Sequence, residues 1–158
     1  MTKRVSLRGR RSKKSKRALK SPQTELRSEP AVPVGDLRPV ARILAIDDDP
    51  AMLSVIRELL QREKFDVTTA NDGQEGMNAF NRTSFDLVLL DIDMPEVSGF
   101  EVLRHIRSRS NDVKVIMVTG LDDLEHGIQA MGSGANGYIT KPFGVGDFIH
   151  EVKRILED

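Results

Sequence analysis

Four short apolar runs of the sequence end in polar residues that could do chemistry together: Asp47 with Asp48, Asp91, Thr119 and Lys141. Carboxylates gathered in one pocket repel one another, which raises their pKa values unless a cation neutralises them. Oxygen ligands without histidine or cysteine favour a hard ion such as Mg²⁺. An ammonium group and a hydroxyl group would add contacts to phosphoryl oxygens, and a carboxylate can act as a nucleophile. If these residues converge, they predict a phosphoryl-binding site with Mg²⁺.

The elements that must position these residues follow from the apolar pattern. Five short runs, most of them apolar throughout, predict strands that are covered on both faces. Apolar residues at helical spacing lie between and after them, and we expect all of these stripes to pack in the core. The strands are expected at residues 43–46, 67–70, 87–90, 115–118 and 138–140. The stripes are Met52, Val55, Ile56, Leu59 and Leu60; Met77 and Phe80; Leu103 and Ile106; Leu124, Ile128 and Met131; and Val145, Phe148, Ile149, Val152, Ile155 and Leu156.

Regular alternation of strand and helix over residues 41–158 predicts an α/β fold with right-handed crossovers. Five strands and five helices suit a flavodoxin-like, doubly wound parallel sheet of strand order 2-1-3-4-5. Such sheets bind ligands beyond the carboxyl ends of the strands, where the strand order reverses. The first and third strands are neighbours at that point, so Asp47, Asp48 and Asp91 are expected to meet in one pocket.

Four motifs over residues 41–158 resemble the receiver domain of bacterial two-component response regulators: ILAIDDDP, LLDIDMPEVSG, VTG and GYITKPF. The resemblance implies that Asp91 is the phosphoacceptor and that Asp48 is a direct Mg²⁺ ligand. Asp47 would act mainly through water or charge, and the backbone carbonyl of Asp93 would be the third protein ligand. Thr119 and Lys141 would contact the phosphoryl oxygens.

The resemblance further implies a switch at Tyr138, whose rotamer follows Thr119, and a cis peptide bond between Lys141 and Pro142. The donor would be a histidine kinase or a histidine phosphotransfer protein, and the target an unidentified protein partner in the cytoplasm. The domain would be a phosphoacceptor with at most slow self-dephosphorylation, not an enzyme. Because nothing follows the last apolar stripe, we expect a stand-alone receiver similar to chemotaxis regulators, without an output domain. Asp93 is acidic where the family often has a neutral side chain, so it could alter dephosphorylation or Mg²⁺ affinity.

Two other functions fit parts of the pattern. Asp91 and Asp93 match the DxD motif of haloacid-dehalogenase-type phosphatases, although that motif normally lies on the first strand. Alternatively, a receiver-like fold could serve as a phosphorylation-independent docking module. The GxGxxG match at residues 132–137 follows a helix and precedes a strand, so it indicates a helix stop rather than a dinucleotide site. The histidines, which are His105, His126 and His150, lack the spacing of metal ligands.

Composition excludes several functions. The chain has no cysteine, so disulfides and thiolate chemistry are excluded. No apolar run is long enough to predict a transmembrane segment, and no secretory signal follows the basic N-terminus. Residues 1–20 hold ten Lys or Arg and no acidic residue, although the whole chain is balanced at 24 basic and 24 acidic residues. Residues 1–40 therefore predict a disordered basic tail and linker, attached to an acidic receiver domain at residues 41–158.

The tail generates a prediction of its own. Because residues 1–20 contain no aromatic residue, we expect any nucleic-acid binding to be non-specific and driven by counterion release. The alternatives are a solvated arm without a partner, an anionic membrane surface (less favoured, because bulky apolar residues are lacking), an acidic partner protein, and the acidic body of the chain itself. Full-length protein should bind DNA or RNA at low salt and lose affinity as salt rises, whereas protein truncated near Arg38 should not bind. Absent binding at low salt, or equal binding by both proteins, would exclude a polyanion-binding tail.

Overall fold

The computed structural model describes residues 40–120 and 124–158, with the side chain of Leu124 excepted. Apart from Val40, the predicted tail lies outside the described residues, so it stays a prediction. The strands are β1 (Arg42–Ile46), β2 (Asp66–Ala70), β3 (Leu87–Asp91), β4 (Lys114–Gly120) and β5 (Gly137–Lys141). The helices are α2 (Pro50–Arg62), α3 (Gly73–Arg82), α4 (Gly99–Arg109), α5 (Leu124–Gly132) and α6 (Val145–Glu157).

The five strands form one parallel sheet in the order β2-β1-β3-β4-β5. The predicted fold class and strand order are therefore confirmed. The order reverses between β1 and β3, which pair directly, with Ile46 beside Leu90. Asp47 follows Ile46, and Asp91 follows Leu90. These two acids therefore lie side by side at the carboxyl end of the sheet.

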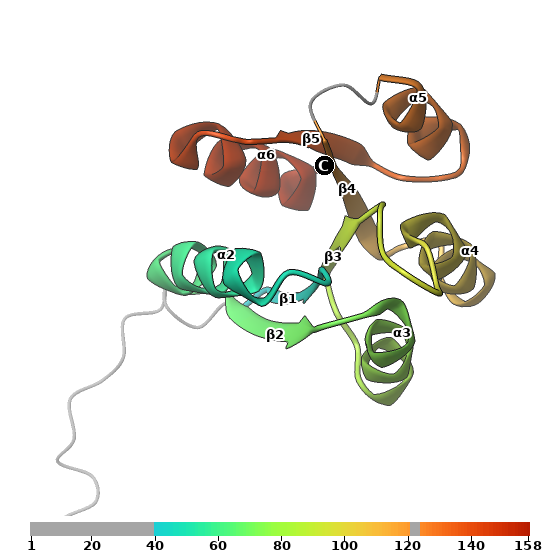
Figure 1. The fold of residues 1–158 in the computed structure, drawn as a ribbon. Helices are drawn as coiled ribbons and strands as arrows, with labels where there is room; N and C mark the ends of the chain where they lie inside the picture. Colours follow the sequence, from blue (N-terminus) through green and yellow to red (C-terminus); the bar gives the residue numbers. More distant parts are fainter. Residues whose placement is uncertain (1–39, 121–123) are drawn as a thin grey trace, which may run out of the picture. The chain divides into compact units, whose positions relative to one another are not determined.

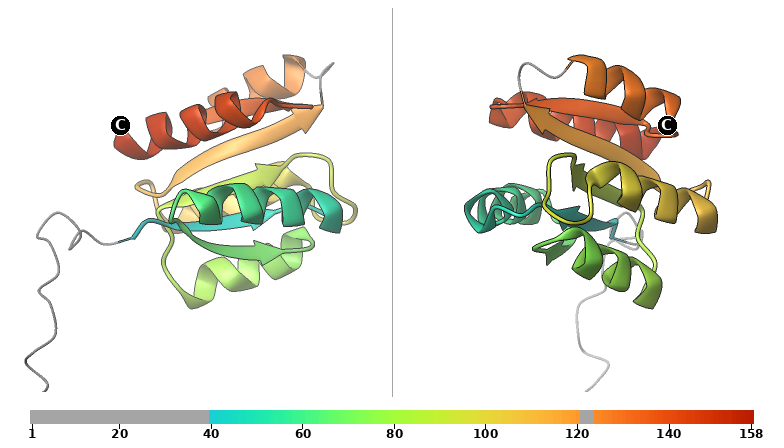
Figure 2. Two further views of the ribbon diagram at one scale, coloured as in Figure 1. Left: turned by 90° about the vertical axis from the view of Figure 1, so that its left-hand side faces the viewer. Right: turned by 45° about the vertical axis from the view of Figure 1, so that its right-hand side comes forward.

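Helices cover both faces of the sheet, with α2 and α6 on one face and α3, α4 and α5 on the other (Figures 1 and 2). Each face has its own core cluster. Phe148 of α6, Leu60 of α2 and Ile116 of β4 belong to the first cluster, whereas Leu103 of α4 and Met117 of β4 belong to the second. None of the helices in residues 40–120 and 124–158 is long and apolar enough to cross a membrane.

Local capping fixes where the helices that flank the site begin. Asp49 caps α2, because its Oδ1 accepts a hydrogen bond from the Ala51 N–H at 2.9 Å, and Pro50 occupies the first helical turn. Ser98 and Glu101 form a capping box at the start of α4. Helix α2 therefore begins three residues after Asp47, and α4 begins at Gly99, after the loop that follows Asp91.

The expectation that all apolar stripes are buried is wrong at four residues: Val55, Ile128, Met131 and Val145 are 48%, 66%, 46% and 56% exposed. In the part of α5 after Leu124, the buried residues are Gly127 and Ala130, which face the sheet. Each residue turns the helix by about 100°, so Ile128 and Met131, one position later, point away from the sheet. Periodicity identified the helix but assigned the wrong face to the core.

The other two exceptions have simpler causes. In α2 the buried positions are Leu53, Ile56 and Leu60, and Val55 precedes Ile56 by one residue, which turns it toward solvent. Val145 is the first residue of α6, which begins beyond the carboxyl end of β5.

The GxGxxG segment is a helix stop, as predicted: Gly132 ends α5, Gly137 begins β5, and Gly134 has a positive φ of 105°. The connection is held by Arg107 of α4, whose Nε donates to the Gly134 carbonyl at 2.8 Å. Its NH2 group donates to Oδ1 of Asn136 at 2.9 Å. Burial lowers the pKa of Arg107. These bonds fix the entry of β5, the strand that carries Tyr138 and Lys141.

Candidate functional site

Three carboxylates converge at the carboxyl end of the sheet. Asp47 and Asp48 follow β1, Asp91 is the last residue of β3, and each offers an oxygen within 4.8 Å of the others. Asp47 and Asp91 are only 2% and 6% exposed, whereas Asp48 is exposed. The convergence that the strand order predicted is therefore present in the structure. Three acids this close require positive charge for their compensation.

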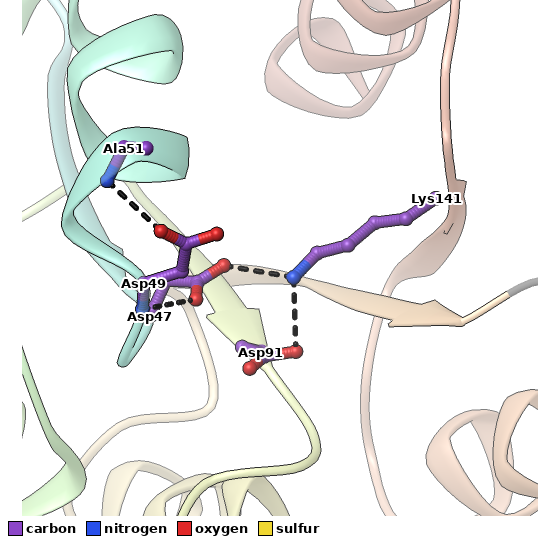
Figure 3. A network of polar contacts seen from close by, with 5 residues as sticks. All are labelled: Asp47, Asp49, Ala51, Asp91 and Lys141. Carbon is purple, nitrogen blue, oxygen red and sulfur yellow. Dashed lines mark hydrogen bonds and ion pairs between the residues drawn. The ribbon is translucent and has the colours of Figure 1, made fainter.

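Lys141 supplies part of that charge from the end of β5. Its Nζ donates to Oδ2 of Asp47 at 2.9 Å and to Oδ1 of Asp91 at 3.4 Å (Figure 3). Burial opposes the charged ammonium group, but its hydrogen bond with Asp47 and the charge of Asp91 outweigh burial and raise the pKa of Lys141. The lysine therefore stays charged and bridges the two buried acids.

Asp47 and Asp48 differ in how their carboxylate oxygens are engaged. Oδ2 of Asp47 accepts from Lys141, and Oδ1 accepts from the Asp49 N–H at 2.9 Å (Figure 3). Asp49 in turn caps α2, so Asp47 is fixed through the first turn of that helix. The exposed carboxylate of Asp48 is the one that faces solvent beside the cluster.

The electrostatic balance at Asp91 remains unfavourable to ionisation. Burial, and next the charge of Asp47, raise the pKa of Asp91 from 3.8 to about 7, although Lys141 acts in the opposite direction. An ionised carboxylate is needed for nucleophilic attack. Added positive charge at the cluster would favour that form.

Thr119 lies on the neighbouring strand, at the same end of the sheet. It is 1% exposed and follows Val118, the register partner of Asp91. Its own register partner on β5 is Thr140, the residue before Lys141. The ends of β1, β3, β4 and β5 thus bring three acids, a hydroxyl group and an ammonium group to one edge of the sheet.

The loop after β3 holds the remaining predicted metal ligand. Asp93 is exposed and lies outside the three-acid cluster; its backbone carbonyl stays a prediction as a ligand. Gly99 begins α4 directly against the Asp91 carbonyl, where a Cβ atom would clash with the backbone of Asp91 and Ile92. A side chain at position 99 would push α4 away from the acidic cluster.

Tyr138 lies on β5 and is 37% exposed, against α5 rather than in the acidic cluster. Its proposed role as a switch therefore depends on movement and not on direct contact. The peptide bond between Lys141 and Pro142 is cis, as the resemblance implied. Of the histidines, His105 contacts Asn81 at 2.9 Å and His126 packs edge-on against Phe100, both outside the three-acid cluster.

Sequence reasoning missed the supporting residues Asp49, Ser98 and Gly99. Ser98 and Glu101 carry the S-x-x-E pattern of a capping box, and Asp49 precedes a proline, so both caps had a readable signal. Gly99 had none, because its role comes from close approach of α4 to β3.

The donor set fits a hard divalent cation. Asp47, Asp48 and Asp91 supply only oxygen, one of them is exposed, and Lys141 cannot neutralise three charges alone. Mg²⁺ accepts one or two carboxylates and keeps several waters, which suits a shallow pocket with one exposed acid.

Comparison with known proteins identifies the family. Residues 43–153 match the model of the response regulator receiver domain. The transcriptional regulatory protein TrcR of Mycobacterium tuberculosis is 33% identical over 115 residues, which cover 73% of this chain and 45% of TrcR. The cell cycle response regulator CtrA of Brucella ovis is 34% identical over 115 residues, which cover 73% of this chain and 50% of CtrA. The chain thus spans about half the length of these relatives.

Solved structures agree. A receiver domain from Clostridium thermocellum superposes with a TM-score of 0.71 and 35% identity, covering 75% of this chain and 95% of that one. The chemotaxis protein CheY4 of Vibrio cholerae gives a TM-score of 0.70 and 28% identity, covering 74% and 99%. With Asp91 at the end of the third strand and not the first, these matches favour a receiver over the haloacid-dehalogenase alternative. The chain belongs to the response regulator receiver domain family.

Proposed function

We propose that this receiver domain accepts a phosphoryl group on Asp91 from a phosphohistidine donor, with Mg²⁺ bound beside it. The observation that carries the proposal is the Lys141 ammonium group, which bridges Asp47 and Asp91 at 2.9 and 3.4 Å while Asp48 stays exposed. Receiver domains are signalling modules rather than classical enzymes. Sustained turnover of a phosphate ester is therefore not expected.

The transfer needs a carboxylate oxygen, a leaving group and charge compensation. An oxygen of Asp91 attacks phosphorus, the phosphorus–nitrogen bond breaks, and the imidazole of the donor leaves with that electron pair. Lys141 and Thr119 would then contact the new phosphoryl oxygens, and Lys141 can do so because it already lies beside Asp91. Bound Mg²⁺ would supply positive charge to the phosphoryl oxygens and favour ionised Asp91.

The first prediction for the site concerns the acceptor residue. Wild-type protein treated with a small phosphodonor and Mg²⁺ should gain one hydroxylamine-labile phosphoryl group, detected by mass spectrometry, and chelation should abolish the gain. Asp91→Asn should remain unlabelled because the amide oxygen is a poor nucleophile. The matched control is Asp93→Asn, an exposed acid two residues away, which should still be labelled. Labelling of Asp91→Asn as fully as wild type would show that another residue is the acceptor.

Asp48 is the better candidate for a direct cation ligand. Both oxygens of Asp47 already accept hydrogen bonds, from Lys141 and from the Asp49 N–H. A carboxylate with its oxygens engaged acts more readily through water or charge than by direct coordination. Asp48 is exposed and lies in the same cluster, so it can turn toward a cation without breaking those bonds.

The second prediction ranks the two acids. Titration calorimetry with Mg²⁺ should show about a tenfold loss of affinity for Asp47→Asn, the low end for residues outside the direct ligand set. Asp48→Asn should lose more. Asp112→Asn serves as the control, because Asp112 is exposed and lies outside the three-acid cluster. If Asp48→Asn keeps more affinity than Asp47→Asn, the proposed order is reversed.

Phosphorylation is proposed to shift an existing equilibrium and to remodel the face made by α5, β5 and α6, which an unidentified partner would bind. We place the exchange in the cytoplasm, the compartment of the histidine kinase or phosphotransfer donor that the family implies. Thr119 and Lys141 would matter more after phosphorylation than before it, because they contact charge that the phosphoryl group introduces. A phosphorylation-independent docking module would lack such a response.

The third prediction uses the one tyrosine of a chain without tryptophan as an intrinsic fluorophore. Beryllofluoride with Mg²⁺, a phosphoryl mimic, should change the fluorescence of Tyr138 in the wild type. Thr119→Ala should still be phosphorylated but should show a weakened fluorescence change. Thr140→Ala, the register partner on β5, is the control and should keep the wild-type change. A full response in Thr119→Ala would exclude this route, and no response in wild type would favour the docking module.

A further inference from the structure

Gly127 lies in the interior of α5 (Leu124–Gly132), where glycine is unfavourable. A glycine there weakens helix formation relative to alanine by about two- to fivefold in the folding equilibrium. Such a residue calls for a packing reason. Gly127 is buried, and α5 packs on β4 and β5.

The packing reason is the ring of Tyr138. A Cβ atom built at Gly127 would lie 3.0 Å from Cε2 and Cζ of Tyr138 and 3.3 Å from Cδ2. The ring therefore lies directly on the bare backbone of α5. Gly132, at the end of the same helix, offers a contrast, because a Cβ atom there would meet nothing within 4 Å.

The contact determines what the surface presents. Tyr138 is 37% exposed in this position, and Ile128 and Met131 of α5 are 66% and 46% exposed. Positions three and four residues apart share one side of a helix, so Met131 is a neighbour of both Gly127 and Ile128. The Tyr138 ring is thus an exposed aromatic group beside the helix that carries these two exposed apolar side chains.

Tyr138 also lies in line with the candidate site. Its register partner is Met117, and the residue two positions further along β4 is Thr119. Side chains two apart in a strand point to the same face of the sheet. Tyr138 and Thr119 therefore lie on the face that α5 covers, and the position of the ring can respond to Thr119.

We propose that Gly127 is a positioning residue: its bare backbone holds the Tyr138 ring at the surface in the unphosphorylated domain and so opposes the response to phosphorylation. The regulatory half of this proposal, that the contact opposes the response to phosphorylation, rests on the proposed function of Asp91. A contact made in one of two states stabilises that state, so losing it shifts the equilibrium toward the other. Side chains at position 127 should displace the ring, leucine more than alanine, and make activation easier.

The contact itself is tested without any phosphoryl group. In a double-mutant cycle, Gly127→Ala and Tyr138→Ala should be coupled, with a difference of at least about twofold in the unfolding equilibrium constant. Gly127→Ala should be more stabilising when the ring is absent. Gly132→Ala with Tyr138→Ala is the matched cycle and should show no coupling. Equal and negligible coupling in both cycles would overturn the proposed contact.

The regulatory half is tested by fluorescence of Tyr138. Gly127→Ala and Gly127→Leu should shift the basal signal toward that of beryllofluoride-bound wild type, in that order. Both should reach half-maximal response at a lower beryllofluoride concentration, whereas Gly132→Ala and Gly132→Leu should match wild type. An unchanged or higher midpoint in both Gly127 variants would overturn the regulatory role. If wild type itself fails to respond, the proposed function of Asp91 fails, while the cycle still decides whether Gly127 positions the ring.

Discussion

The burial of two carboxylates against a single ammonium group is the interaction on which the rest of this structure depends. Asp47 and Asp91 are almost inaccessible, Lys141 bridges them, and Asp48 adds a third charge at the rim. Burial, and next the charge of Asp47, raise the pKa of Asp91 to about 7, so Lys141 offsets these effects only in part. The pocket is thus left in need of positive charge, which is the property that a phosphoryl-accepting, cation-binding site requires.

Much of this could be predicted from the sequence, because the signals are local and the strand order is constrained. Buried parallel strands are apolar throughout, and their carboxyl ends share one edge of the sheet. Once the order places β1 beside β3, Asp47 and Asp91 must meet, whatever the details of the helices. The hydrogen-bond partners were harder to predict from the sequence. The bond from the Asp49 N–H to Asp47 depends on how α2 starts, which a sequence pattern suggests but does not determine.

The face of α5 could not be predicted, since periodicity alone does not say which side of a helix meets the sheet. An ordinary apolar stripe would bury Ile128 and Met131, but α5 buries Gly127 and Ala130 instead. The deciding partner is Tyr138 on the next strand, whose ring needs space on the helix backbone. That α5 turns its small residues toward the sheet can be explained only when the position of the Tyr138 ring is known.

The acidic pocket and the Tyr138 ring lie at two ends of one connection. Thr119 and Lys141 end neighbouring strands, and Tyr138 precedes Lys141 by three residues on β5. If a phosphoryl group is added to Asp91, its oxygens would become partners for Lys141 and Thr119. The strand that carries Lys141, β5, also carries the Tyr138 ring. A displacement at the pocket can therefore alter the position of the Tyr138 ring, because a closely packed interior transmits strain. The Tyr138 ring lies against the backbone of α5 and is 37% exposed, so it is the part of β5 at which the change should reach the surface.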